Sequence, residues 1–394
     1  MTVTFVSNYI NHHQIPFSDA CYEKLGEGYH FIQTEPMETE RVAMGWSVDI
    51  DKLPYVRCWY KQEKECRELI MESDIVIFGW TGREDIISER LEAGKPTIRV
   101  SERLYREGQW KAISPRGLLR KYKEHTKYRK APVCLLCAGA YVASDFHIIR
   151  AYPDKLLRFG YFPETVIYTE GELEKLKEDT GRADIVWAGR FMPLKHPEYA
   201  VRIAEELKNE NKSFHIHMVG SGEMDEELKR RVTENDLEEY FTFYGYTEPK
   251  NVRKIMEKCH IHLFTSNYLE GWGAVVNEAM NSGCAVVANV EAGAVPFLIK
   301  HGENGLVYRN GSYEDFSVQV KKLVENPELR KKLGKEAYNT IVGKWNAEYA
   351  AKELLRFCGD FIDGKVIPAK EGPLSPAPVI APGKMYEKVI RHKL

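Results

Sequence analysis

Two glutamates, Glu270 and Glu278, lie eight positions apart around a glycine-flanked turn. Ionised carboxylates accept hydrogen bonds from vicinal hydroxyl groups, such as those of a sugar. The apolar run from Ile261 to Phe264 predicts a strand before the turn, and the pattern after it predicts a helix that ends at Gly283. A strand, turn and helix of this kind presents free backbone N–H groups and the positive end of the helix dipole to an anionic phosphate. The segment therefore predicts a nucleotide-sugar site.

The size and charge of the chain restrict its class. With 394 residues it exceeds the usual size of one hydrophobic core, so we expect two domains. A net charge of -2 argues against a general nucleic-acid binder. The eight cysteines have no framework spacing, as expected in a reducing cytosol. The sequence starts with a strand-like run, not with a basic segment and an apolar core, so we expect a cytoplasmic protein.

Strand-like apolar runs alternate with amphipathic helix-like runs along most of the chain, and the alternation restarts after Arg182. This pattern is typical of α/β domains in which helices cover a parallel sheet, so it predicts two doubly wound halves. The expected segments are an N-terminal domain over 1–165, a linker over 166–181, a C-terminal domain over 182–345, a helix over 346–364 that can cross back to the N-terminal domain, and a Pro-rich tail with a short basic end over 365–394.

Several motifs of the second half occur in the order and spacing of a known family. They are Gly189-Arg190 with Lys195, Val219-Gly220-Ser221-Gly222, Phe243-Tyr244-Gly245, Glu270 with Glu278, and Gly302-Glu303-Asn304-Gly305. In these motifs the chain resembles the family four glycosyltransferases of the bacterial surface-polysaccharide type. The resemblance implies a retaining, metal-independent transferase of the GT-B fold, in which two Rossmann-like domains face a central cleft.

The resemblance places Arg190 and Lys195 on the diphosphate of the donor. Both follow the first strand of the second domain, at the edge of an open parallel sheet where ligands gather. Two fixed cations can neutralise the charge that develops as a nucleoside diphosphate leaves. The alternative is two solvated surface cations.

The resemblance also divides the two glutamates between parts of the donor. Glu270 would hold hydroxyl groups of the transferred sugar, and Glu278 the ribose. The backbone N–H groups of Gly273, Ala274 and Val275 would then lie near the phosphates. The alternative is a helix-capping acid and an exposed helical glutamate.

Four further residues complete the expected donor site. Trp272 either packs under the sugar or staples the turn. Gly220 and Ser221 belong to a short glycine turn that admits phosphates or the base; it lacks the third glycine of a dinucleotide fingerprint, which disfavours an NAD oxidoreductase. Tyr246 occupies the family's nucleobase position or is an ordinary turn aromatic.

The first half departs from the family at the end of its first strand. Where the family has a glycine-rich loop, this chain has Asn11, His12 and His13. Polar loop residues at the end of a first strand are candidates for contact with donor or acceptor. The alternative is that they cap a helix that begins near Ile15. Adjacent histidines do not form a metal site by themselves, so no metal is expected.

A second departure concerns the end of a later strand, where the family often has a histidine. This chain has Glu102 there. Glu102 is either a polar group on the acceptor side or the ion-pair partner of Arg103 or Arg99.

Residues 103–130 form a basic stretch with ten lysines or arginines against two glutamates, interspersed with large apolar residues. Such a stretch can lie on an anionic membrane surface. The alternative is a solvated helix face. No nucleic-acid recognition module accompanies the stretch, so nucleic acid is not an expected partner.

The sequence thus predicts a retaining glycosyltransferase without a cofactor, whose co-substrate is a UDP- or GDP-type sugar. The expected acceptor is a glycan or a polyprenyl-linked glycan in polysaccharide biosynthesis, and the enzyme is expected in the cytoplasm, peripherally at the inner face of the plasma membrane. The alternatives are a nucleotide-sugar epimerase, a phosphorylase, or a catalytically silent subunit that binds a nucleotide sugar. Fold alone does not choose among them.

Overall fold

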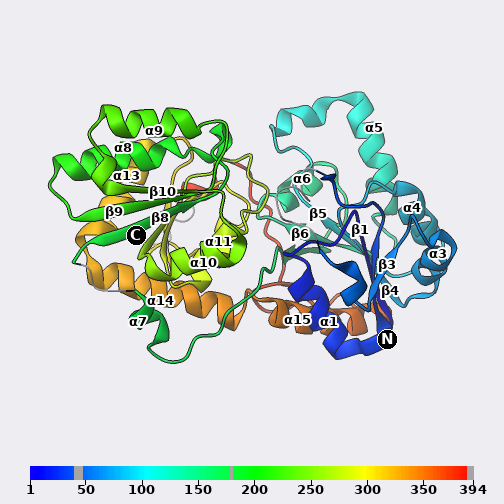
Figure 1. Ribbon diagram of the computed structural model, residues 1–394. Coiled ribbons are helices and arrows are strands. Elements are labelled where there is room, and N and C mark those ends of the chain that lie inside the picture. Colours follow the sequence, from blue (N-terminus) through cyan, green and yellow to red (C-terminus); the bar gives the residue numbers. More distant parts are fainter. Residues whose placement is uncertain (40–47, 178–180, 388–394) are drawn as a thin grey trace. The chain divides into compact units, whose positions relative to one another are not determined.

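The computed structural model describes residues 1–39, 48–177 and 181–387, and the chain forms two compact units (Figure 1). The N-terminal unit consists of residues 1–164 and 344–380, and the C-terminal unit of residues 165–343 with the segment from Ala381 onward. Each unit is a parallel sheet with α-helices on its faces. The prediction of two doubly wound α/β domains is confirmed.

The N-terminal unit contains a seven-stranded sheet in the order β3-β2-β1-β4-β5-β6-β7, and all neighbouring strands are parallel. Its strands are β1 (Val3–Ser7), β2 (Tyr29–Gln33), β3 (Val56–Cys58), β4 (Ile75–Phe78), β5 (Thr97–Ser101), β6 (Val133–Ala138) and β7 (Leu156–Phe159). Its α-helices are α1 (Ile15–Leu25), α3 (Glu63–Glu72), α4 (Glu84–Glu92), α5 (Pro115–Glu124), α6 (Val142–Ile148) and α15 (Ala347–Ile362).

The C-terminal unit contains a six-stranded parallel sheet in the order β10-β9-β8-β11-β12-β13. Its strands are β8 (Ala183–Ala188), β9 (Phe214–Val219), β10 (Phe241–Gly245), β11 (Ile261–Phe264), β12 (Ala285–Asn289) and β13 (Leu306–Tyr308). Its helices are α7 (Glu172–Leu176), α8 (Glu198–Asn209), α9 (Asp225–Glu234), α10 (Pro249–Lys258), α11 (Val275–Asn281), α12 (Val295–Leu298), α13 (Tyr313–Glu325) and α14 (Pro327–Gly343).

The central strands are apolar runs because helices cover both faces of each sheet. Every residue of β1, β6, β8 and β12 is buried. In each sheet the strand order reverses once, between β1 and β4 in the N-terminal unit and between β8 and β11 in the C-terminal unit. Such a switch point is where open α/β sheets bind ligands, outside the carboxyl ends of the strands. The fold therefore predicts that ligands bind at the loops that follow these four strands.

The boundary between the units differs from the expected one. The segment expected as a linker, residues 166–181, packs on the C-terminal unit over the part that the structure describes. The Val166 N–H donates to Asn281 Oδ1 at 2.8 Å, and the Tyr168 N–H donates to the Tyr338 hydroxyl at 2.9 Å. These polar partners, distant in the sequence, hold the segment on that unit.

The C-terminal segments divide between the units. Helix α15 packs against α1 within the N-terminal unit. The Pro-rich stretch that follows stays there, where the Arg158 N–H donates to the Ser375 carbonyl at 2.7 Å. From Ala381 the chain belongs to the C-terminal unit, and the Gly383 N–H donates to Glu291 Oε1 at 2.9 Å. Most of the expected basic end, residues 388–394, lies outside the described residues.

No helix within residues 1–39, 48–177 and 181–387 combines the length and the apolar character needed to cross a membrane. The eight cysteines are all buried thiols.

We predict opposite effects of alanine at two helical glycines. A Cβ at Gly334 in α14 would lie 2.2 Å from the Gly283 carbonyl oxygen, whereas a Cβ at Gly359 in α15 would meet nothing within 4 Å. Gly359→Ala should stabilise the protein by about 1 kcal/mol, because alanine is the better helix former. Gly334→Ala should destabilise it by roughly 1–3 kcal/mol, because the backbone at Gly283 or Gly334 must move to make room for the methyl group. Urea unfolding of both variants and the wild type measures the difference; equal effects would contradict this packing.

Candidate functional site

Glycines bring together the loops that follow β8, β9 and β10. Gly220 has φ +129°, and a Cβ on it would lie 1.9 Å from the Gly189 carbonyl oxygen. A Cβ on Gly222 would lie 2.4 Å from the Phe191 carbonyl oxygen. The Phe191 N–H donates to the Ser221 carbonyl at 3.0 Å, and the Gly220 N–H donates to the Gly245 carbonyl at 2.9 Å. The structure therefore joins the expected phosphate loop and the glycine turn in one backbone cluster.

The central polar contact joins Lys195 to Glu270. Lys195 ends a short 3-10 helix after β8, and Glu270 lies in the turn after β11. Lys195 Nζ lies 2.7 Å from Glu270 Oε2, and their side chains are 18% and 17% exposed. Two residues expected to touch different parts of one ligand thus form a partly buried ion pair. Glu270 does not have the helix-capping role considered as an alternative, because its carboxylate binds this lysine.

Arg190 differs from Lys195 in its surroundings. It is exposed and makes no hydrogen bond or ion pair with the residues that the structure describes. Its loop is held by the backbone contacts of Phe191, the next residue. The guanidinium is therefore a cation whose donors are available to an anionic ligand.

The turn that carries Glu270 depends on Gly273 and Trp272. Gly273 has φ +89°, and a Cβ on it would lie 2.4 Å from Cζ of Phe264. Trp272 is 1% exposed, and its indole N–H donates to Asn277 Oδ1 at 2.9 Å. Of the two roles expected for Trp272, its burial and this hydrogen bond favour packing within the turn over packing under the sugar.

The start of α11 has unused donors. Within the described residues, the N–H groups of Gly273 and Ala274 donate no hydrogen bond, and Val275 is the first residue of the helix, where an N–H has no partner inside the helix. The helix has only seven residues. These N–H groups can bind an anion together with a cation such as Arg190.

Glu278 lies in α11 and is not the exposed helical glutamate considered as an alternative. Its side chain is partly buried, and burial raises its pKa from 4.5 to about 7, while the positive charge of Arg253 acts in the opposite direction. Arg253 Nη1 also donates to Asn281 Oδ1 at 2.6 Å. The structure thus places Glu278 beside α10 and Arg253, apart from the Lys195–Glu270 pair. Tyr246, after β10, is 59% exposed, so its ring is accessible.

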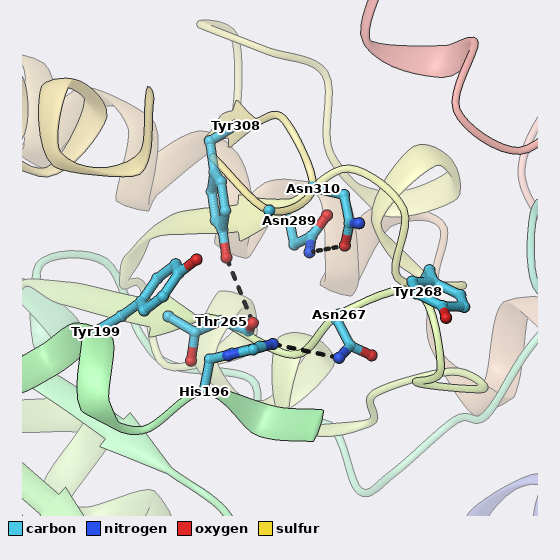
Figure 2. A pocket seen from close by; sticks show the side chains of 9 residues that line it. His196, Tyr199, Thr265, Asn267, Tyr268, Asn289, Tyr308 and Asn310 are labelled. Carbon is cyan, nitrogen blue, oxygen red and sulfur yellow. Dashed lines mark hydrogen bonds between the residues drawn. The ribbon is translucent and has the colours of Figure 1, made fainter. Parts of the chain in front are cut away.

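A cavity of about 230 Å³ in the same unit is lined by residues that stand next to Lys195 and near Glu270 in the chain (Figure 2). Its walls include His196 after Lys195, Asn267 before Glu270, and the side chains of Tyr199, Asn289 and Asn310. The sequence reasoning did not select any of these residues. Asn267, Asn289 and Asn310 each follow or end an apolar strand, and that position was the available signal.

In the N-terminal unit, Asn11 shapes the loop between β1 and α1. Its Oδ1 accepts the His13 N–H at 3.0 Å, and its carbonyl accepts the N–H groups of Gln14 and Ile15. The Asn11 side chain thus stabilises the turn before α1 but does not cap the helix, whose N-cap residue is Gln14, without a side-chain cap. This loop is held by its own hydrogen bonds.

The two histidines of this loop lie in contact, with ring centroids 3.9 Å apart. Burial, followed by the nearby charge of His12, lowers the pKa of His13 to about 3, and burial lowers the pKa of His12. His13 is therefore uncharged at neutral pH. Its ring stacks on Tyr161 at a centroid distance of 6.1 Å.

Glu102 belongs to the same cluster through Tyr161, whose hydroxyl donates to Glu102 Oε1. Glu102 also pairs with Arg106 at 2.7 Å. Neither ion-pair partner expected from the sequence is correct, because Arg103 pairs with the buried Asp145 and Arg99 pairs with Glu84.

Two polar atoms beside this cluster are buried without a partner among the described residues. They are Trp80 Nε1 and Gln14 Oε1, a donor and an acceptor. Trp80 follows β4 and packs edge-on against Tyr161, which follows β7. The sequence reasoning missed Trp80 and Tyr161; each stands after a glycine at a strand end.

Comparisons with known proteins show what this chain is similar to. The family described as glycosyl transferases group 1 matches residues 169–340, which include the four charged residues of the expected donor site. An uncharacterized glycosyltransferase of Haemophilus influenzae is 29% identical over 167 residues, 42% of this chain and 45% of that protein. The amylovoran biosynthesis glycosyltransferase of Erwinia amylovora is 24% identical over 176 residues, 42% of this chain and 43% of that protein. The chain spans a little under half of the length of these relatives.

Among solved structures, HepE of Anabaena in complex with UDP has a TM-score of 0.69 to this chain. The match covers 91% of this chain and 100% of that one at 14% identity, so it shows a shared fold.

We predict that Glu278→Gln changes how stability depends on pH. The folded pKa of Glu278 exceeds the unfolded value, so its stabilising contribution is complete below about pH 4.5 and is lost as the pH rises through 7. Glutamine stays neutral. The variant should therefore match the wild type near pH 4.5 and exceed its unfolding free energy at pH 8, by at most about 3 kcal/mol.

Unfolding by urea at pH 5 and pH 8 measures this difference. The exposed Glu239→Gln is the matched control and should show no gain between the two pH values. A gain for Glu278→Gln that is equal at both pH values would contradict a raised pKa.

Proposed function

We propose that this chain, whose residues 169–340 match the family described as glycosyl transferases group 1, is a retaining, metal-independent glycosyltransferase with a UDP- or GDP-type sugar donor. Its two parallel α/β units are those of the GT-B fold. The proposed acceptor is a glycan or lipid-linked glycan of a polysaccharide pathway. The name of the Erwinia relative, in amylovoran biosynthesis, and the UDP bound to HepE support the acceptor and donor classes.

The observation that carries this proposal is the Lys195–Glu270 pair at the switch point of the C-terminal sheet. A cation at that position can stabilise the negative charge of a leaving diphosphate. A carboxylate at the same position can accept hydrogen bonds from the hydroxyl groups of the transferred sugar. Before a donor binds, the two groups neutralise each other, so each partly buried charge has a counter-charge.

Arg190 and the start of α11 complete the proposed diphosphate site. Arg190 contributes a solvent-exposed guanidinium, and Gly273 to Val275 contribute unpaired N–H groups. As the bond between the sugar and the diphosphate breaks, these groups stabilise the leaving oxygen. The acceptor hydroxyl attacks from the face that the diphosphate leaves, and a phosphate oxygen takes its proton. No protein nucleophile is needed for retention in this scheme.

Glu278 is the proposed ribose ligand. Its partly buried carboxyl gains hydrogen bonds from ribose hydroxyl groups, and such bonds favour the ionised form. Donor binding should therefore lower the raised pKa of Glu278.

The proposed acceptor side is the cluster around Tyr161 in the N-terminal unit. His13 is neutral there, and Glu102 is held by Arg106 and the Tyr161 hydroxyl. The buried Trp80 Nε1 and Gln14 Oε1 have no partner among the described residues. A hydroxyl-rich acceptor can supply hydrogen bonds to such groups, which otherwise cost free energy.

Helix α5 supports an interaction with an anionic membrane surface. None of its residues is buried, and its large apolar side chains are exposed: Leu118 by 41%, Leu119 by 56% and Tyr122 by 55%, together with the preceding Trp110 by 68% and Ile113 by 79%. The alternative expected from the sequence was a helix face that contacts only water. Such a face does not explain why these large apolar side chains are exposed. Apolar groups beside arginine and lysine fit the headgroup region of anionic lipid. Such binding would place the enzyme at the inner face of the plasma membrane.

The function is tested with a panel of UDP- and GDP-sugars, by nucleotide release and by transfer to glycan acceptors. At least one donor should be consumed, and the product linkage should keep the anomeric configuration of the donor by NMR. Lys195→Ala should lower kcat with that donor by about 10²–10³-fold, as expected for one electrostatic group at a developing charge.

Lys332→Ala, an exposed lysine on α14, is the control and should leave turnover unchanged. If no donor of the panel is consumed, the enzyme proposal is wrong. Full turnover by Lys195→Ala would refute the leaving-group role alone.

For the membrane surface, we predict that the full chain floats with vesicles that contain anionic lipid. Leu119→Ser combined with Ile113→Ser should reduce the bound fraction, because both side chains are more than half exposed. Arg116→Gln with Lys123→Gln should reduce it as well, by roughly fivefold per charge. The exposed apolar control, Val318→Ser on α13, should have no effect. Unchanged flotation of both double variants would exclude α5 as the contact.

A further inference from the structure

The cavity beside the Lys195–Glu270 pair has no role in the donor chemistry proposed above. It opens at the carboxyl ends of β11, β12 and β13 and against α8 (Figure 2). His196 and Asn267, one on each loop of the ion pair, form part of its wall and contact each other at 3.2 Å. The cavity thus shares two supporting loops with the proposed donor site, and neither Lys195 nor Glu270 lines it.

Eight residues with polar side chains and one glycine line the cavity, and none of them is a lysine, arginine, aspartate or glutamate, although most of the surface that they expose to it is apolar. Three carboxamides, from Asn267, Asn289 and Asn310, occur together with the phenols of Tyr199 and Tyr308. The only titratable base of the lining, His196, is already hydrogen-bonded to Glu198 at 2.8 Å, and the lining has no carboxylate, so it is poorly suited to a phosphate or an ammonium group. Carboxamides and phenols both donate and accept hydrogen bonds, so they suit a neutral ligand with many hydroxyl groups.

Part of the hydrogen-bonding capacity of the lining is unused. Asn310 Oδ1 accepts from Asn289 Nδ2 at 2.8 Å, which orients the Asn310 amide, and its Nδ2 has no partner among the described residues. The Tyr199 hydroxyl likewise makes no hydrogen bond within that part of the chain. Burial raises the pKa of Tyr199, so its hydroxyl keeps its proton as a donor at neutral pH. A ligand would therefore meet donors that already have fixed positions.

The size of the cavity limits the ligand. About 230 Å³ is less than the roughly 300–1,000 Å³ typical of pockets for drug-sized ligands, and corresponds to about seven or eight waters. A single sugar ring fits this range, whereas a nucleotide does not. Tyr308 and Thr265 are each 1% exposed, and the Tyr308 hydroxyl lies 3.4 Å from the Thr265 carbonyl, so this wall is firmly packed.

We propose that this cavity binds a neutral, unphosphorylated monosaccharide or a polyol of similar size, at a site separate from that of the nucleotide sugar. Its hydroxyl groups would bond to Tyr199 and Asn310. The occupant would also contact Asn267, whose carbonyl accepts the Glu270 N–H at 3.0 Å and whose N–H donates to the Leu194 carbonyl at 2.9 Å. Binding in the cavity is thereby linked to the loops of Lys195 and Glu270.

The test is calorimetric titration of the full chain with glucose, galactose, mannose and N-acetylglucosamine, and with glucose 6-phosphate as the charged probe. At least one neutral sugar should bind saturably, and glucose 6-phosphate should bind more weakly than glucose. Tyr199→Phe and Asn310→Ala should each weaken binding by about fivefold, as expected for one neutral hydrogen bond. Tyr199→Phe removes a single oxygen, so it should leave folding intact.

Two control variants separate this site from its surroundings. Asn339→Ala changes an exposed asparagine on α14 and should bind sugar like the wild type. Arg190→Ala should weaken UDP binding but leave sugar binding unchanged, so a failure of the donor proposal is distinguishable from a failure here. The proposal is overturned if no neutral sugar saturates, if both cavity variants bind like the wild type, or if glucose 6-phosphate binds as tightly as glucose.

Discussion

Contact between bare backbones at the edge of the C-terminal sheet determines where the charged residues of this protein lie. The loops after β8 and β9 approach so closely that a methyl group on Gly220 would lie 1.9 Å from the Gly189 carbonyl oxygen. The chain segment that passes through this contact continues to Arg190 and Lys195. A second close approach, that of Gly273 to the Phe264 ring, shapes the turn that holds Glu270. The absence of side chains at these glycines therefore positions the side chains that can do chemistry.

These contacts place opposite charges at the switch point without leaving either one unpaired. Lys195 and Glu270 bind each other at 2.7 Å, Arg190 extends into solvent, and Glu278 has a pKa raised to about 7 by burial. A nucleotide sugar would supply a binding partner to each of these groups. Its phosphates would bind the cations, and its hydroxyl groups would donate hydrogen bonds to the carboxylates. The uncharged lining of the neighbouring cavity differs from this arrangement, and the two sites therefore suit ligands of different charge.

The N-terminal unit uses a different set of groups at the equivalent edge of its sheet. Its cluster of His13, Tyr161, Glu102 and Trp80 is aromatic, and the histidine is uncharged. Where the family has a glycine-rich loop, Asn11 closes a compact turn by its own hydrogen bonds. The loop in which this half departs from the family motifs therefore has a compact structure of its own, and it lies on the side proposed for the acceptor.

By itself the sequence determined the fold class and indicated which charged residues of the second half lie at the carboxyl edge of its sheet. Parallel strands covered on both faces are continuous apolar runs, and residues after such strands converge at one edge, so both could be predicted from order and spacing. Tertiary structure alone decided that Lys195 pairs with Glu270 across 75 positions, that Trp272 is buried in the turn and that burial raises the pKa of Glu278 to about 7. It also decided that residues 166–177 join the C-terminal unit, and that three asparagines enclose a cavity. These features depend on packing between segments that are distant in the chain. Local sequence patterns carry no information about such packing.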